Sequence, residues 1–369
     1  MSDTKNPSSS PLPRRTFIKG AAATTAVAAM GAPAIVSAKR KIRWKMVTAW
    51  PRNFPGLGTG ANALAKLITE MSGGRLEVKV FGAGELVQAF EIFDVVSRGT
   101  ADMGHGAAYY WKGKHPATQF FAAVPFGLTA QEMNAWIYQG GGYQLWEKLY
   151  RQFDLIPSVA GNTGTQMGGW FNKEINQVED LNGLKMRIPG LGGEVLKRAG
   201  GTPVNIPGGE IFSALSSGTI DATEWVGPYN DLAFGIYKAA QYYYYPGWHE
   251  PGTTIECLIS RKSFEALPKD LQSIVQNAIK VANMNMLANF TARNNSALEI
   301  LVNKHKVDLR PYPKDVLVKL RDLSDEVVAE IAHENPLSKE IYDSYRAFRA
   351  QAVAWHSVSE QAYMNARHG

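Results

Sequence analysis

The stretch EIFSALSSGTIDATEWVG, residues 210–227, decides the fold because most of it occurs twice in the chain. Residues 91–102 read EIFDVVSRGTAD and residues 210–221 read EIFSALSSGTID, so seven of twelve positions are identical. In each copy the apolar residues fall on one face of a helix, and a glycine (Gly99 or Gly218) follows where a helix ends with positive φ. Thr-x-Asp then leads into a short strand. The sequence therefore predicts one helix–turn–strand unit in each half of the molecule.

The segments around the two copies predict an α/β fold with two lobes. Residues 41–49 and 75–81 alternate as strands, and residues 59–71 between them have helical spacing. We expect the two copies to continue into strands over Ala101–Gly104 and Ala222–Val226. Two similar α/β halves place a cleft between them, and ligands favour such interfaces.

The first 38 residues are typical of an export signal. Arg14 and Arg15 form a twin-arginine pattern, and a weakly apolar run over residues 20–36 leads to Val-Ser-Ala, ending at Ala38. The run is rich in Ala, Gly and Thr and falls short of the roughly 20 apolar residues that a membrane anchor needs. We therefore expect export to the periplasm by the twin-arginine route, with cleavage near Ala38.

The rest of the chain divides into two lobes that share its C-terminal part. We expect lobe 1 over residues 39–160, lobe 2 over residues 161–250, and a last segment over residues 251–369 that spans both lobes. That segment begins with a strand that returns to lobe 1 and continues into long helices, broken near Pro336. Helices of this length brace a two-lobed body and also offer a dimer contact.

The charge and cysteine content exclude several classes of function. Without the first 38 residues the chain has 35 basic and 32 acidic residues, and no long run of one sign, so it has no nucleic-acid footprint. Cys257 is the single cysteine and lies in strand-like sequence, which favours a buried hydrophobe over a catalytic thiol. The histidines lack paired metal-ligand spacing, and no nucleophile elbow or nucleotide fingerprint occurs. We therefore expect a binding protein and not an enzyme.

Five candidate site residues lie at expected strand ends or lobe crossings: Gln166, Arg187, Glu224, Trp225 and Glu250. An arginine offers a planar fork that matches a carboxylate ligand, but two glutamates beside it would repel that ligand. A cation such as Na⁺ or Ca²⁺ resolves the contradiction, because it binds carboxylate, amide and backbone oxygens together with oxygens of the ligand. The alternative is a purely structural ion pair between Arg187 and Glu224.

The residues after the first repeat are candidates for the wall of the cleft. His105, Tyr109, Tyr110 and Trp111 follow the strand of that repeat, and ligands bind outside the C-terminal ends of such strands. Local packing is the alternative for each of them. We expect Tyr109 and Tyr110 to contact the ligand.

Three segments carry a resemblance to a known family: LNGLKMRIP at residues 181–189, VNIPGGE at residues 204–210 and GTIDATE at residues 218–224. On these segments the chain resembles a substrate-binding protein of the tripartite ATP-independent periplasmic (TRAP) transporters, in the DctP group. The resemblance covers essentially all of the chain after the export signal. It implies a two-lobed α/β fold of the type II periplasmic-binding-protein kind, with long C-terminal helices. It also implies a membrane permease as partner and, in some members, a homodimer through the C-terminal helices.

The resemblance further implies roles for the candidate site residues. Arg187 matches the arginine that pairs with the substrate carboxylate in this family. The chain is similar to the branch of the family that binds 2-oxo acids or lactate with a metal ion, since it matches that branch at Gln166, Glu224, Trp225 and Glu250. In that branch the two glutamates, the glutamine and the tryptophan carbonyl hold the cation, and the glutamine and tryptophan also contact the substrate.

The expected function is therefore binding of a small 2-oxo monocarboxylate, such as pyruvate, and its delivery to a membrane permease. Two alternatives stay open at this point. In the first alternative, the ligand is lactate or another 2-hydroxy acid bound with Ca²⁺. In the second, the protein is a ligand-sensing module that is not coupled to transport.

Overall fold

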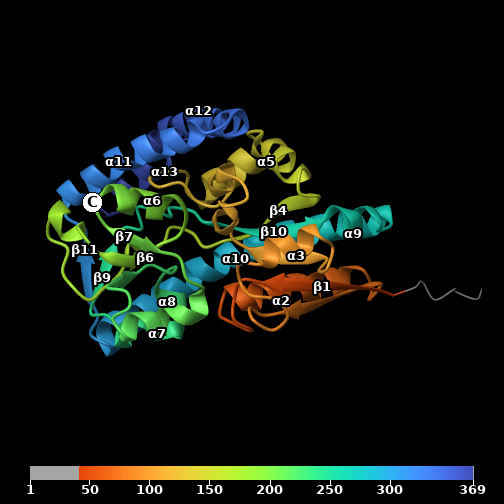
Figure 1. Cartoon of the computed structure of the whole chain (residues 1–369), viewed down its shortest axis with the longest axis horizontal. Coiled ribbons are helices and arrows are strands. Elements are labelled where there is room, and N and C mark those ends of the chain that lie inside the picture. The colour runs from red at the N-terminus through yellow and green to blue at the C-terminus, as the bar shows by residue number, and fades with distance from the viewer. Residues whose placement is uncertain (1–40, 369) are drawn as a thin grey trace, which may run out of the picture. The chain divides into compact units, whose positions relative to one another are not determined.

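The computed structural model describes residues 41–368, so the expected export signal lies outside the described residues. These residues form two mixed β-sheets with helices packed on them, which confirms the predicted α/β class (Figure 1). None of the helices between residues 41 and 368 is both long and apolar enough to span a bilayer.

The first sheet has the strand order β2-β1-β3-β10-β4. The central strand β3 pairs in parallel with β1 and antiparallel with β10, which arrives from the distant C-terminal half. Its strands are β1 (Ile42–Thr48), β2 (Leu76–Phe81), β3 (Met103–Gly106), β4 (Leu155–Asn162) and β10 (Thr254–Ser260). The accompanying helices are α2 (Leu57–Met71), α3 (Ile92–Ser97), α4 (Ala130–Tyr138), α5 (Gly142–Arg151) and α9 (Arg261–Glu265), with 3-10 turns η1 (Ala108–Trp111) and η2 (Pro116–Phe121).

The second sheet has the strand order β11-β9-β5-β8-β6-β7. Its strands are β5 (Gly169–Phe171), β6 (Lys185–Arg187), β7 (Thr202–Val204), β8 (Ala222–Thr223), β9 (Tyr242–Tyr245) and β11 (Asp308–Pro311). The helices between them are α6 (Gly190–Arg198), α7 (Ile211–Ser216) and α8 (Pro228–Phe234), with short turns η3 (Val178–Leu181), η4 (Gly208–Glu210) and η5 (Ile236–Lys238). The sheet places the ends of β6 and β8 side by side, because these strands are parallel neighbours.

The repeated sequence forms the same unit in both sheets. α3 and α7 each span six residues, and Gly99 (φ 72°) and Gly218 (φ 71°) follow them in the left-handed conformation that glycine favours. The strand predictions were partly wrong. β3 starts at Met103 and not at residue 101, and β8 ends at Thr223, so Glu224 and Trp225 lie beyond the strand.

Two short segments carry the chain between the sheets. Residues 163–168 lead from β4 to β5, and residues 246–253 lead from β9 back to β10. Backbone hydrogen bonds join the segments to each other, from Thr163 N to Thr253 O, from Gln166 N to Glu250 O and from Gly247 N to Gln166 O, at 3.0–3.1 Å. The two crossings therefore form one bridge.

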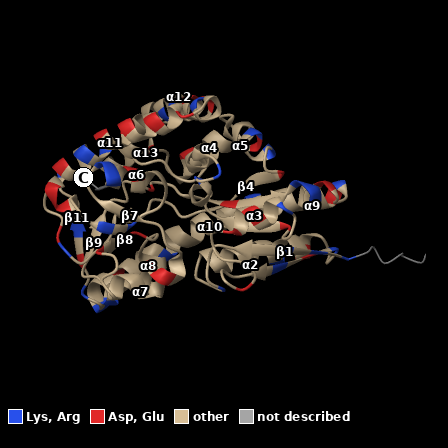
Figure 2. Ribbon diagram, viewed as in Figure 1, with Lys and Arg blue, Asp and Glu red and all other residues tan. Residues whose placement is uncertain are grey.

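Long C-terminal helices connect the same two regions. α10 (Lys269–Glu299) packs on β4 and α2 at one end and on α8 at the other, and ends in a π-helical turn, η6 (Ile300–Lys304). α11 (Lys314–His333) packs on α6, and α12 (Pro336–Val358) packs on η2, α4 and α5 (Figure 1). The break near Pro336 is confirmed, and α13 (Glu360–His368) adds a second break at residue 359. Basic and acidic residues are both present along α11 and α12 (Figure 2).

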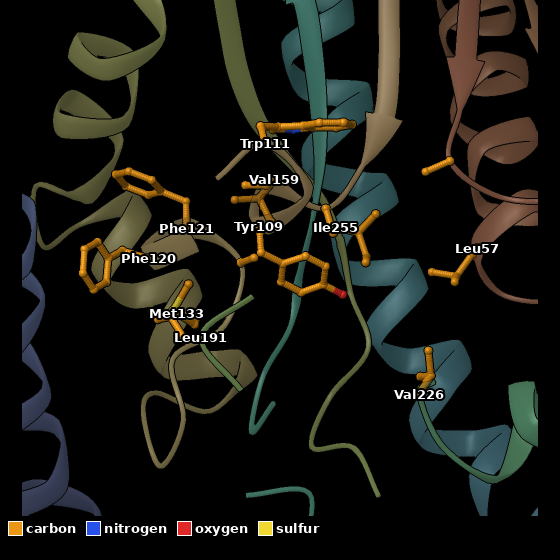
Figure 3. Packing of buried hydrophobic residues seen from close by; sticks show 14 of the residues in the cluster. Leu57, Tyr109, Trp111, Phe120, Phe121, Met133, Val159, Leu191, Val226 and Ile255 are labelled. Carbon is orange, nitrogen blue, oxygen red and sulfur yellow. The ribbon is translucent and has the colours of Figure 1, made fainter. Parts of the chain in front are cut away.

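The largest hydrophobic cluster extends from the first sheet to the second. It includes Tyr109 and Val159 from the first region and Leu191 and Val226 from the second (Figure 3). Trp225 of the second region belongs to it as well. The face of the first sheet toward α2 and α10 has its own cluster, as does the face of the second sheet toward α6 and α11. Cys257 is fully buried in the first of these two clusters, as expected of a small hydrophobe.

Candidate functional site

Arg187 and Glu224 form a buried ion pair at the adjacent ends of β6 and β8. The backbone N–H of Glu224 donates to the carbonyl of Arg187 at 3.1 Å, which fixes the two residues side by side. Nη1 of Arg187 donates to Oε1 of Glu224, and the two side chains are 1% and 0% exposed. A buried charge pair of this kind is costly to desolvate and does not by itself indicate a stabilising role.

The guanidinium of Arg187 also contacts residues of both regions. Its Nε donates to the carbonyl of Ile206 at 3.2 Å, and its Nη2 lies 3.4 Å from the hydroxyl of Tyr110, which belongs to η1 next to the first sheet. Its cationic carbon lies 5.2 Å from the ring of Trp225, within the range of a cation–π interaction. Arg187 therefore lies where residues of both regions meet.

Gln166 and Glu250 occupy the two crossing segments and contact each other. Nε2 of Gln166 donates to Oε2 of Glu250 at 2.8 Å and lies within 3.1 Å of the hydroxyls of Thr163 and Thr253. Gln166 is 4% exposed and Glu250 is 3% exposed. The bridge between the sheets thus contributes an amide and a carboxylate to the site.

His249 is a site residue that the sequence reasoning missed. Its Nε2 lies 3.4 Å from Oε2 of Glu224, and one ring nitrogen of His249 lies within 4.8 Å of one oxygen each of Glu224 and Glu250. A side chain at Gly192 in α6 would meet the Cβ of His249 at 2.9 Å, so the glycine allows this close approach. The signal that could have found it is its position directly before Glu250.

Several polar atoms of this cluster are buried without a hydrogen-bond partner among the described residues. They are Oε1 of Gln166, Oε2 of Glu224 and both ring nitrogens of His249. Orphaned buried oxygens cost free energy unless something satisfies them. One amide oxygen and carboxylate oxygens beside each other are the ligands that Na⁺ or Ca²⁺ prefers, so the residues present fit a cation.

Burial decides the ionisation of these groups. It raises the pKa of Glu224 to about 7 against the opposite effect of Arg187, and together with the nearby Glu224 it raises the pKa of Glu250 to about 7. Burial lowers the pKa of His249 to about 4, so its imidazole is neutral at pH 7. Burial is the largest single effect on Arg187 and acts to lower its pKa, but Glu224, Tyr110, Tyr109 and Glu250 together raise the pKa above its ordinary value. A cation would favour the charged form of both glutamates.

Aromatic rings surround the polar cluster. The ring of Trp225 lies 6.2 Å from those of Trp50 and Phe54 and 5.2 Å from that of Phe234, centroid to centroid. The ring of Trp225 lies directly on Gly208, where any Cβ would collide with it.

Tyr109 and Tyr110 pack edge to face with ring centroids 4.8 Å apart, and Tyr109 also packs against the start of α6 in the second region. A Cβ on Gly190, the first residue of α6, would lie 3.0 Å from the Cβ of Tyr109, and Gly190 has φ of 61°. Both tyrosines therefore lie beside the Arg187–Glu224 pair.

His105 and Trp111 bind partners in the first region. The Nε1 of Trp50 donates to Nδ1 of His105 at 2.8 Å, and burial lowers the pKa of His105 to about 3. Trp111 donates its Nε1 hydrogen to Glu256 in β10. Four residues were expected on the cleft wall. The structure brings Tyr109 and Tyr110 to Arg187, whereas His105 and Trp111 pack within the first region.

The chain matches known proteins over nearly its whole length. Residues 46–335 match the bacterial extracellular solute-binding proteins of family 7 (DctP), and residues 11–31 match a signal sequence of the twin-arginine translocation pathway, which confirms the expected export to the periplasm. A monocarboxylate 2-oxoacid-binding periplasmic protein of Nostoc sp. is 44% identical over 95% of this chain and 98% of its own length.

Two solved structures are similar in both sequence and fold. They are TRAP periplasmic solute-binding proteins of Pseudoalteromonas atlantica, with bound sodium and pyruvate, and of Colwellia psychrerythraea, with bound calcium and pyruvate. Each is 45% identical, covers 88% of this chain and 99% of its own, and has a TM-score of 0.86. The chain therefore belongs to family 7 of the bacterial extracellular solute-binding proteins, the DctP family of TRAP transporter solute-binding proteins.

Proposed function

We propose that this protein binds a small 2-oxo monocarboxylate together with a cation in the periplasm and delivers it to a TRAP permease. The observation that carries the proposal is the buried cluster of one arginine, two glutamates and one glutamine, in which an amide oxygen and a carboxylate oxygen have no partner among the described residues. The pyruvate and the sodium or calcium bound by the two similar structures support it.

The charges of the cluster assign the roles. Arg187 would receive the carboxylate of the ligand, because a guanidinium binds a carboxylate through two parallel hydrogen bonds. Gln166, Glu224 and Glu250, with the backbone carbonyl of Trp225, would hold the cation. The cation supplies positive charge that offsets the two glutamates and binds oxygens of the ligand.

Aromatic side chains would complete the ligand site. Trp225, Tyr109 and Tyr110 would exclude water from the bound acid, which strengthens the charge interactions around it. The hydroxyl of Tyr110, which lies 3.4 Å from Nη2 of Arg187, would share the ligand carboxylate with the guanidinium.

We also propose the division into lobes. Residues 39–160 would form one lobe and residues 161–250 the other, with residues 251–369 spanning both, and the ligand would close them about the crossings near Gln166 and Glu250. Contacts that join the two regions support a closed state: Asn230 Nδ2 donates to the carbonyl of Pro55 at 2.9 Å, and Lys112 pairs with Glu194 at 2.7 Å. Small-angle scattering should give a smaller radius of gyration with ligand, and identical curves at saturation would contradict closure.

Titration calorimetry of the chelator-treated protein tests the ligand and the site together. Pyruvate should bind tightly with Ca²⁺ or Na⁺ present and weakly without either, and lactate serves as the 2-hydroxy acid for comparison. Binding of pyruvate that is independent of any cation would overturn the proposal. The acid should be recovered unchanged after dialysis, as expected of a transport protein.

Variants separate the two halves of the site. Arg187→Ala should make the free energy of pyruvate binding less favourable by about 2–5 kcal/mol at any concentration of cation, since it removes the charge-assisted pair between the guanidinium and the ligand carboxylate. Glu224→Gln should lower the affinity for pyruvate, and added Ca²⁺ should partly restore that affinity. Glu299→Gln changes an exposed glutamate of α10 and should leave both affinities unchanged. Equal loss in Arg187→Ala and Glu224→Gln at all Ca²⁺ concentrations would leave the pair as a structural element only.

We further propose a homodimer through the C-terminal helices. Large hydrophobic side chains are exposed on the last turns of α12 and on α13: Val353 (52%), Trp355 (65%), Val358 (72%), Tyr363 (65%) and Met364 (49%). Such a patch marks a contact surface more often than a bare solvent face. Light scattering coupled to gel filtration should give the mass of a dimer, and Trp355→Glu should give a monomer. A monomer in the unchanged protein would contradict the proposal.

A further inference from the structure

We propose that His249 gives the cation site a nitrogen ligand, so that Glu224, His249 and Glu250 bind a transition-metal ion of the zinc type at the place assigned to Na⁺ or Ca²⁺. The inference rests on the proposed position of the cation site and adds a metal class to it. It starts from an imidazole that is 1% exposed and has no hydrogen-bond partner on either nitrogen among the described residues.

The distance between His249 and Glu224 fits metal ligation better than a hydrogen bond. Nε2 of His249 and Oε2 of Glu224 lie 3.4 Å apart, beyond the 2.7–3.2 Å of ordinary N–H···O bonds. Two ligand atoms at about 2.0–2.1 Å from a tetrahedral zinc ion lie about 3.3 Å from each other. The two atoms are thus already spaced as neighbours in the shell of one zinc ion.

Glu250 supplies the third ligand. One of its oxygens lies within 4.8 Å of both other ligand atoms, and its Oε2 accepts hydrogen bonds from Gln166 and Thr253 that hold the side chain in place. Backbone bonds from Glu250 N to Gly247 O and from Gln166 N to Glu250 O fix the turn that carries both His249 and Glu250. Supporting bonds of this kind orient the ligands of metal sites.

One nitrogen and two carboxylate oxygens, with a position left for a ligand oxygen, make a donor set that zinc accepts in proteins. Calcium and sodium prefer oxygen alone, so the imidazole adds little to their binding. His249 therefore acts on metal choice: a site with the histidine takes both classes of ion, and a site without it takes only the oxygen-seeking ones.

Metal titration of the mature, chelator-treated protein tests this, with Zn²⁺ and Ca²⁺ each added alone. We expect one tight Zn²⁺ equivalent that Ca²⁺ displaces only in large excess. Loss of a residue that supports a metal site lowers metal affinity by roughly 10–100-fold, so His249→Gln should lower the affinity for Zn²⁺ by at least that much. The same variant should change the affinity for Ca²⁺ by less than about twofold. His333→Gln removes an exposed histidine and should change neither. Co²⁺ gives a readout independent of affinity, since its visible absorption should be that of a nitrogen-ligated, low-coordinate ion and should vanish in His249→Gln.

Two results would overturn the inference. The first is equal Zn²⁺ affinity in the unchanged protein and in His249→Gln, which would place zinc elsewhere. The second is equal loss of Zn²⁺ and Ca²⁺ in that variant, which would mean that His249 only maintains the shape of the site. In either case Ca²⁺-dependent binding of pyruvate by the unchanged protein would leave the proposed function standing, whereas absence of that binding would count against the function itself.

Discussion

The buried carboxyl group of Glu256 makes the stability of the fold depend on pH, and one substitution isolates the effect. Glu256 lies in β10 with no exposed surface and accepts hydrogen bonds from Nε1 of Trp111 and, at 2.8 Å, from the hydroxyl of Tyr150. Burial raises its pKa from 4.5 to about 7, against the opposite effect of these two bonds. Between these pH values the folded protein therefore holds a proton that the unfolded chain has lost.

The sign and size of the effect follow from this difference in pKa. The contribution of Glu256 to the free energy of unfolding is fully present below about pH 4.5 and is lost as the pH rises to about 7. At about 1.4 kcal/mol for each pH unit, the loss amounts to about 3 kcal/mol. Glu256→Gln places a neutral amide there at every pH, so this loss disappears.

Urea unfolding at pH 5, 6, 7 and 8 measures the effect. We expect Glu256→Gln to lie within about 1 kcal/mol of the unchanged protein at pH 5, since one hydrogen bond is exchanged for another. At pH 8 it should be about 2–3 kcal/mol more stable. Glu299→Gln, at an exposed position, should follow the unchanged protein throughout. The same pH dependence in Glu256→Gln and in the unchanged protein would mean that folding does not raise the pKa of Glu256.

Three further predictions concern export, packing and the site. Replacing Arg14 and Arg15 with lysine should leave the precursor in the cytoplasm, as fractionation would show; normal export would contradict the twin-arginine assignment. Asp231→Ala should lower the free energy of unfolding by about 2–4 kcal/mol, because it leaves two buried aromatic donors unpaired. A loss under about 1 kcal/mol in urea unfolding would argue against it. Gly208→Ala should lower the affinity for pyruvate and have a smaller effect on stability, measured as the melting temperature, because the added Cβ displaces the ring of Trp225. Unchanged affinity in calorimetry would count against that ring as part of the site.

The framework of the fold could be predicted because local chemistry sets it. The two glycines after the repeat helices, Gly99 and Gly218, both adopt the positive φ that their position requires. The boundaries failed where contacts distant in sequence decide them. β11 has little strand propensity, with an arginine and a proline in four residues, and forms because it pairs with β9. Pairing of that kind leaves no periodic pattern in the sequence.

α6 shows why composition misled at one point. Gly190, Gly192 and Gly193 are poor helix formers, yet α6 begins at Gly190. Packing overrides this propensity: a Cβ at Gly193 would meet the carbonyl of Ile188 at 2.6 Å, and one at Gly192 would meet His249. The glycines that weaken the helix signal are those that let α6 approach the site.

The sequence predicted the two carboxylates of the candidate site, Glu224 and Glu250, but not its histidine, His249. Glu224 follows the end of β8 and Glu250 lies in a crossing beside Pro251, both in connecting segments, where functional side chains gather. His249 stands in the same crossing, but metal ligands were sought at helical spacing, and its partner Glu224 is 25 positions away in the numbering. Only the pairing of the sheets and the crossings brings the two together.

The bridge between the two sheets sets the order in which the site is assembled. Gln166 and Glu250 lie on the crossings themselves, which are hydrogen-bonded to each other. These two side chains therefore keep their separation whatever angle the sheets adopt, whereas Arg187 and Tyr110 come from opposite sides and meet only when the sheets approach. If the proposed roles hold, an ion would have two of its ligands, Gln166 and Glu250, in place at any angle between the sheets, whereas the acid would find Arg187 and Tyr110 together only once the sheets approach. On the proposed function, the affinity for the acid would therefore depend on whether the ion is already bound.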